Sequence, residues 1–246
     1  MSLTVNQLLR QYEKGRRDFR GVDLSGADLH GVALIDVNLA DANLRNANLE
    51  RAFLSKSVFT KACLAWANLS YAKLNNADLA DADLTKANLT AAFLGKAGLQ
   101  RSQLTGANMA HANLRGASLW RANVCGANLR EANLREVNLG GANLSWTTLV
   151  EALLCRARLN GATFNGSHLS RALIKEVDWS GANLSELNLQ EARLIRVNLS
   201  QANLFLANME QAECQTCNFQ GTCFRSANCQ AASFVNSDLR EANCRR

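Results

Sequence analysis

Residues 77–91 read ADLAD-ADLTK-ANLTA, three consecutive copies of a five-residue unit of the form Ala-(Asp or Asn)-Leu-x-x. The unit continues without an inserted or missing residue from Phe19 to Cys244. We call its central position i. Leucine fills 32 of the 46 central positions, and alanine fills 31 of the 45 positions at i−2 counted from Val22 to Ala242. A strict internal repeat, rather than an average composition, therefore decides the fold.

A period of five residues suits neither a helix nor a flat strand. A helix turns about 100° per residue, so leucines five residues apart would spread around its circumference. In a flat strand, an odd period would point successive leucines to opposite faces. Within one unit, however, positions i−2 and i share one side of an extended segment, and the last two residues can turn a corner. Four such corners close a square coil of 20 residues, with leucine and alanine inside and parallel backbone pairing between stacked coils.

This pattern, with Leu or Phe at the centre, Ala at i−2 and Asn or Asp at i−1, resembles the pentapeptide-repeat family. The resemblance covers residues 18–246 and implies the family's fold, an all-β, right-handed quadrilateral parallel β-helix. We therefore predict an N-terminal helical cap at residues 1–17, followed by a β-helix of about 11 coils at residues 18–246.

The first 17 residues do not fit the repeat and predict a short amphipathic helix over residues 5–14. Thr4 and Gln7 have the spacing of a capping box, and Gly15 is a suitable stop. Such a helix would cover the first coil, whose open edge would otherwise invite pairing with another chain. The stretch LRQYEKG at residues 9–15 is similar to the start of cyanobacterial members of the family.

Composition favours one continuous rod in the cytoplasm. The chain has no proline and no linker, no run approaching 18 apolar residues that could span a membrane, and no secretory signal pattern at its N-terminus. Eight cysteines without such a signal indicate free thiols in a reducing compartment.

Candidate chemical groups are scattered. His30, His111 and His168 fall on one face but are separated by four and three coils, roughly 14–20 Å at the spacing of β-strands, which is too far to share a metal or a proton. Cys214 and Cys217 resemble half of a zinc site, yet both fall at inward positions and no second pair completes four ligands. We interpret these two cysteines as packing residues and expect no catalytic residue, no cofactor and no metal.

The register assigns every residue to one of four faces. The basic face, made of the units centred on Leu34, Leu54 and every twentieth residue to Phe234, carries nine Lys or Arg and four Asp or Glu, a net +5 of the chain's +6. Its i−1 positions are often apolar or basic, a mixture that favours an interaction surface. The alternative is that such side chains half-bury against neighbouring coils. The predicted partner-binding residues are Phe53, Lys73, Phe93, Arg115, Arg135, Leu153, Arg156, Leu173, Lys175 and Arg193.

These observations predict a non-catalytic scaffold that binds an unknown protein, as a monomer or as an end-to-end dimer through its C-terminal coil. The family resemblance adds an alternative, a quinolone-resistance type of protein that mimics DNA and binds a type II topoisomerase. A DNA mimic should present rows of acidic charge, whereas this chain has 27 basic and 21 acidic residues. A third hypothesis is weak binding of nucleic acid or another anionic surface by the basic face.

Overall fold

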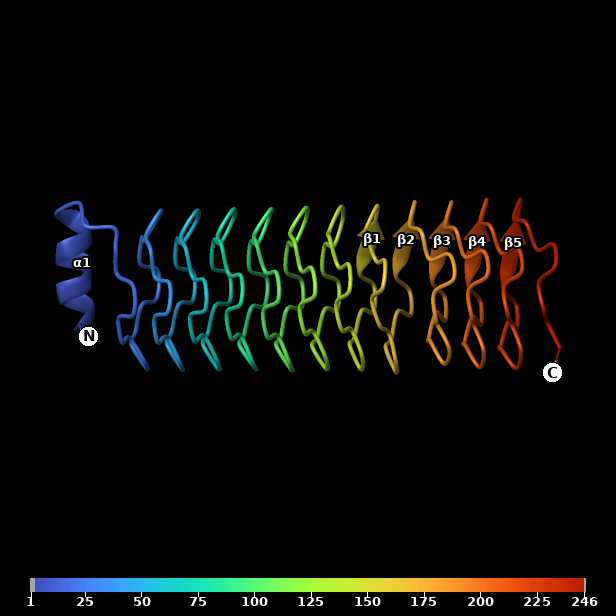
Figure 1. The fold of residues 1–246 in the computed structure, drawn as a ribbon, viewed down its shortest axis with the longest axis horizontal. Helices are drawn as coiled ribbons and strands as arrows, with labels where there is room; N and C mark the ends of the chain where they lie inside the picture. Colours follow the sequence, from blue (N-terminus) through green and yellow to red (C-terminus); the bar gives the residue numbers. More distant parts are fainter. Residues whose placement is uncertain (1–2, 246) are drawn as a thin grey trace.

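The chain winds into a rod of stacked coils, with helix α1 (Val5–Glu13) at one end (Figure 1). This structure is a computed structural model, and it describes residues 3–245. Residues 1–2 and 246, the outer ends of the predicted cap and of the predicted β-helix segment, lie outside the described residues.

Each coil contains 20 residues, as predicted. Residues at i−1 form parallel bridges with the residue 20 positions further on, as in the series Asn48, Asn68 and Asn88. The central leucines are buried from Leu24 to Leu204, most of them completely. The parallel β-solenoid, the inward leucines and the number of residues per coil are therefore confirmed.

Within residues 3–245, continuous strands form only on the basic face, where five successive coils pair over three residues each. The sheet is parallel and its strands follow chain order (Figure 1). Elsewhere, a single bridge per unit joins neighbouring coils. The strands are β1 (Leu153–Cys155), β2 (Leu173–Lys175), β3 (Arg193–Ile195), β4 (Glu213–Gln215) and β5 (Ser233–Val235).

Asparagine side chains at i−1 link the coils. The Asn88 Oδ1 atom accepts a hydrogen bond from the Thr90 backbone N–H at 3.2 Å, and its Nδ2 donates to Asn68 Oδ1 of the preceding coil at 3.1 Å. These residues thus bond both to local backbone and to the neighbouring coil. Most asparagines at i−1 lie outside the shaft but are half-buried, because their amides stack on those of adjacent coils.

The corners use a left-handed backbone at i+2. Glycines such as Gly21 and Gly26 adopt φ of 62° and 65° there. In addition, 34 of the described residues other than glycine adopt positive φ at equivalent corners, Ala91 at 54° among them. Since an L-residue costs roughly 1–2 kcal/mol in this conformation, the burial of the interior holds the corners in place.

Helix α1 covers the first coil, as predicted. Thr4 and Gln7 form the capping box, and Leu8 is completely buried against the interior of the solenoid. The Tyr12 hydroxyl contacts the backbone N–H and C=O of Ile35, each at 3.3 Å. The apolar face of the helix therefore closes one end of the shaft.

Within the described residues, the coil-to-coil bridges are interrupted at two neighbouring positions. The bridges expected between Arg158 and Asp178 and between Thr163 and Asn183 are missing, whereas all their equivalents in other coils are present. The interruption lies between residues 157–166 and residues 177–186. We call this opening the slot.

Candidate functional site

The structure brings the predicted i−1 residues of the basic face into one row. Bridges join position 53 successively to positions 73, 93, 113, 133 and 153, and β1, β2 and β3 extend the row to position 193. The remaining predicted residues lie beside this row at i+1 and i+2: Arg115, Arg135, Arg156 and Lys175. All ten predicted residues therefore share one face of the rod.

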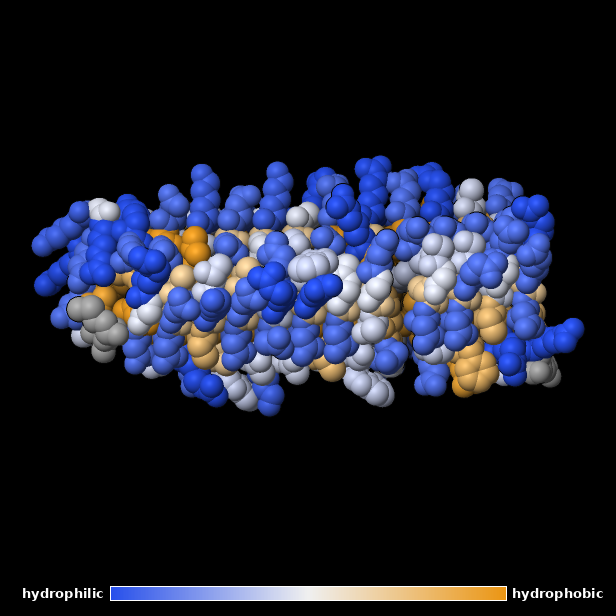
Figure 2. All heavy atoms as spheres, viewed as in Figure 1, coloured by the Kyte–Doolittle hydropathy of each residue, from blue (hydrophilic) through white to orange (hydrophobic). Residues whose placement is uncertain are grey.

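The apolar members of the row differ in exposure. The rings of Phe53 and Phe93 are exposed by 39% and 43%. Leu153 and Leu173 are half-buried within β1 and β2, which fits the alternative that i−1 side chains pack against neighbouring coils. Figure 2 shows that hydrophilic side chains cover most of one side of the rod, with hydrophobic residues in separate patches.

Ion pairs neutralise much of the C-terminal half of the basic face. Arg156 and Arg196 both bind Glu176, the former at 2.6 Å, and Arg193 binds Glu213 at 3.2 Å. Hydrogen bonds from Arg156 and then Arg196 lower the pKa of Glu176 to about 2. Three arginines of this half therefore pair on the surface with acids in adjacent coils.

The N-terminal half of the face keeps its charge. Lys56, Lys73 and Lys96 are exposed, and no salt bridge within residues 3–245 joins them to an acid. The Lys73 ammonium lies 4.4 Å from the centroid of the Phe53 ring, a cation–π contact. We call Phe53, Lys56, Lys73, Phe93 and Lys96 the lysine–phenylalanine patch.

A shallow hollow of about 610 Å³ adjoins this patch. It lies where Gly95 and Gly116 present no side chain, between Asn75 of one coil and Glu136 further along the face. Lys96 and Arg115 also line it, and Arg115 donates a hydrogen bond to Glu136 at 2.9 Å. The patch thus borders a depression that a projecting group of a partner could enter.

The histidines are not brought together. His111 Nδ1 lies 3.2 Å from a Glu131 carboxylate oxygen, and His168 Nδ1 lies 3.5 Å from the Asn188 amide, each contact joining adjacent coils. No group of three or more His, Cys, Asp or Glu that could hold a metal lies within the part of the chain that the structure describes.

Cys214 and Cys217 are both buried, and burial raises the pKa of both thiols. The Cys217 Sγ donates a hydrogen bond to the Leu194 carbonyl at 3.4 Å. Ser57 fills the same i−2 position and makes the equivalent bond to Leu34 at 2.9 Å. These contacts agree with the interpretation of the two cysteines as packing residues.

Two features escaped the sequence-based prediction. The predicted set omitted Lys56 and Lys96, although the same register places both on the basic face. The slot was also missed, and the available signal was Trp179 at a central position that leucine usually fills.

Comparison with known proteins places the fold in a family. The family described as "Pentapeptide repeats" matches this sequence in overlapping segments that run from residue 18 to residue 211. A search of curated proteins found no significant match. No helix among residues 3–245 has the length and apolar character needed to cross a membrane.

Several solved structures are similar. HetL from the cyanobacterium Nostoc sp. strain PCC 7120, described as involved in heterocyst differentiation regulation, is 28% identical, with a TM-score of 0.67; the match covers 98% of this chain and 96% of HetL. The Nostoc protein alr5209 is 31% identical over 52% of this chain and 82% of its own, with a TM-score of 0.24. A trypsin-treated form of QnrB1, a plasmid-mediated fluoroquinolone resistance protein, is 18% identical, with 90% and 91% of the two chains covered and a TM-score of 0.37.

The family match covers well over half of the chain, and the stacked 20-residue coils are the structure that the repeat dictates. This protein belongs to the pentapeptide-repeat family.

Proposed function

We propose that this protein is a non-catalytic cytoplasmic scaffold that binds an acidic partner protein through the lysine–phenylalanine patch. The observation that carries the proposal is the contrast along the basic face. Lys56, Lys73 and Lys96 have no acidic partner in the described residues, whereas four of the five arginines further along the face are paired: Arg115, Arg156, Arg193 and Arg196.

The patch combines the two features of a protein-binding surface. Unpaired ammonium groups attract a complementary negative surface and accelerate association. The exposed rings of Phe53 and Phe93 offer apolar area, and aromatic side chains are enriched among the residues that contribute most to binding. Phosphate groups of duplex DNA would use the lysines but would leave both rings exposed, so the observations favour a protein over nucleic acid.

Similarity supports the class of function. The family is generally non-catalytic. HetL, which is similar over nearly the whole chain, is described as taking part in regulation. We extend to this chain the idea of a regulatory binding protein, and the acidic partner is inferred from the patch alone.

Capture of partners from a lysate of the source organism tests the proposal. A patch variant carries Phe53→Ser, Phe93→Ser and Lys73→Glu. We expect it to capture at least about tenfold less of the wild-type partner, a loss of about 1.4 kcal/mol in binding free energy. Circular dichroism must first show that the variant folds.

A matched control carries the same kinds of change on other faces: Trp66→Ser, Trp120→Ser and Lys61→Glu. It should capture as much partner as the wild type. Equal capture by the patch variant would refute the proposal. A shift of duplex DNA by the wild-type protein that disappears in the patch variant would instead favour the nucleic-acid hypothesis.

A further inference from the structure

The slot is a local loss of backbone pairing. In the coils before and after the slot, six backbone hydrogen bonds join each pair of neighbouring coils over the equivalent ten residues. None of these six bonds forms between residues 157–166 and residues 177–186. Ala162 and Ala182 are half-buried, whereas every other i−2 residue from Val37 to Thr222 is buried. The two coils therefore separate on two adjacent faces and stay paired on the other two.

Large rings inside the shaft account for this separation. Trp179 and Phe164 occupy central positions of adjacent coils and pack edge to face, with their centroids 5.6 Å apart. A core that receives more volume than it can hold shifts its backbone. Among the buried side-chain N and O atoms of the described residues, the indole Nε1 of Trp179 is the one without a hydrogen-bond partner.

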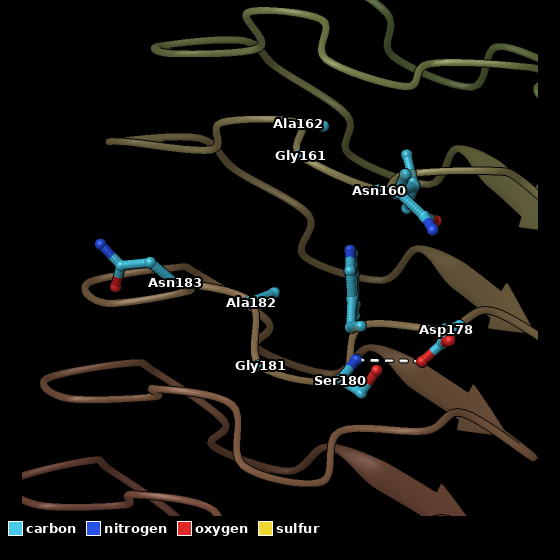
Figure 3. Close-up of a pocket in the computed structure, with 10 residues that line it drawn as sticks. Asn160, Gly161, Ala162, Asp178, Ser180, Gly181, Ala182 and Asn183 are labelled. Carbon is cyan, nitrogen blue, oxygen red and sulfur yellow. Dashed lines mark hydrogen bonds between the residues drawn. The ribbon is translucent and has the colours of Figure 1, made fainter.

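The slot contains a cavity of about 300 Å³, which is large enough for a small ligand. Figure 3 shows Asn160, Gly161 and Ala162 on the coil above it and Asp178, Ser180, Gly181 and Ala182 on the coil below. Asp178 accepts a hydrogen bond from the Ser180 backbone at 3.0 Å (Figure 3) and is the charged residue of the lining. Trp179 also lines the cavity, and its buried indole N–H has no hydrogen-bond partner.

The two lips of the slot carry complementary backbone groups. The lip at residues 157–166 presents mainly N–H donors, and the lip at residues 177–186 presents mainly C=O acceptors. In intact coils, the equivalent N–H groups of one coil donate to the C=O groups of the next. No hydrogen bond within residues 3–245 satisfies the four donors. These donors are the backbone N–H groups of Leu159, Gly161, Phe164 and Gly166.

We propose that the slot binds a short extended peptide segment of a partner protein, which pairs with the backbone groups of both lips. An extended peptide offers alternating donors and acceptors at the spacing that a parallel ladder requires. Asp178 favours a neutral or basic segment. This site lies away from the lysine–phenylalanine patch, whose proposed partner is acidic, so the two proposals stand independently.

The test uses the full chain and a phage library of random linear seven-residue peptides. The library is first depleted on the Trp179→Leu variant, in which the slot should close, and is then selected on the wild type. Selected peptides should bind the wild type at least tenfold more tightly than Trp179→Leu in calorimetry. Trp66→Leu, which changes an exposed tryptophan elsewhere, should bind them like the wild type.

Two further measurements do not depend on the variant. Methylation of the peptide's backbone nitrogens should abolish binding, because it removes the donors. Bound peptide should slow hydrogen exchange at the four donor amides of the slot. The proposal is overturned if no selected peptide discriminates between the wild type and Trp179→Leu, if N-methylated peptides bind equally well, or if the four amides of the free protein exchange as slowly as those of intact coils.

Discussion

Replacing Trp179 with leucine should stabilise the protein, although it removes the largest fully buried side chain. Leucine occupies most of the other central positions, so the variant restores the usual unit. With the smaller side chain, the two coils can approach and the slot can close. The change in free energy is the balance of four terms.

Two terms favour leucine. Removing a buried N–H without a partner recovers about 2 kcal/mol. Restoring the six missing backbone hydrogen bonds adds about 3 kcal/mol, if each contributes about 1 kcal/mol and hydrogen bonds to water already supply half of that. Two terms oppose it: about 1.5 kcal/mol of lost apolar burial and about 1 kcal/mol for the edge-to-face pair with Phe164. The net expectation is a stabilisation of about 2–3 kcal/mol.

Thermal unfolding followed by circular dichroism should show a midpoint about 5–10 °C higher in Trp179→Leu than in the wild type. Because repeat proteins open locally, hydrogen exchange gives the sharper reading. The amides of Leu159, Gly161, Phe164 and Gly166 should change from fast to slow exchange. Trp66→Leu, at a ring exposed by 51%, should change the midpoint little.

A variant less stable than the wild type by more than about 1 kcal/mol, with the four amides still exchanging fast, would refute this reasoning. Such a result would mean that the tryptophan ring supports the separated coils, and that the slot has another cause.

Three other predictions address the corners, the ion pairs and the asparagine ladder. Ala91→Gly should stabilise the rod by about 0.5–1 kcal/mol because it relieves a left-handed alanine, whereas Ala92→Gly, at a buried extended position, should destabilise it; melting curves compare the pair. The pKa of Glu176 is lowered to about 2 from 4.5, so its stabilising effect is complete above pH 4.5 and disappears as the pH falls toward 2. As the pH falls across that window, the melting temperature of Glu176→Gln should therefore decrease less than that of the wild type. Equal decreases would contradict the stabilising role of the Glu176 ion pairs. Asn88→Asp keeps the acceptor but loses the donor to Asn68, so chemical denaturation should show a loss of about 1–2 kcal/mol.

The fold followed from the sequence because one period controls every element. A unit of five residues with Leu at i and Ala at i−2 permits few backbones, and the square coil satisfies both its apolar spacing and its odd length. The helix at residues 5–13 followed from separate signals, the capping box at Thr4 and the helical spacing of its apolar residues. Neither inference required contacts between distant residues.

The candidate site was only partly predictable. The register located the basic face, and it also places Arg156 beside Glu176 in the next coil, but summing the charge of a face conceals such pairing. Which i−1 side chains stay exposed depends on packing between coils, so Phe53 and Leu153 could not be told apart by position. The slot depends on the volume of the Trp179 side chain, and a pattern that records only whether a residue is apolar does not distinguish tryptophan from leucine.

The 20-residue register also constrains how the gene for such a protein can change. Losing or duplicating a whole coil leaves every later side chain on its original side of the rod, so length can vary in steps of 20 residues without scrambling the surface. Losing a single five-residue unit would preserve the interior equally well, yet it would rotate everything downstream by a quarter turn. Lys73 and Phe93 would then leave the row of i−1 residues that begins at Ala33, if the lost unit lay between Ala33 and Lys73. Selection for a binding surface should therefore tolerate duplications of whole coils and remove those of single units.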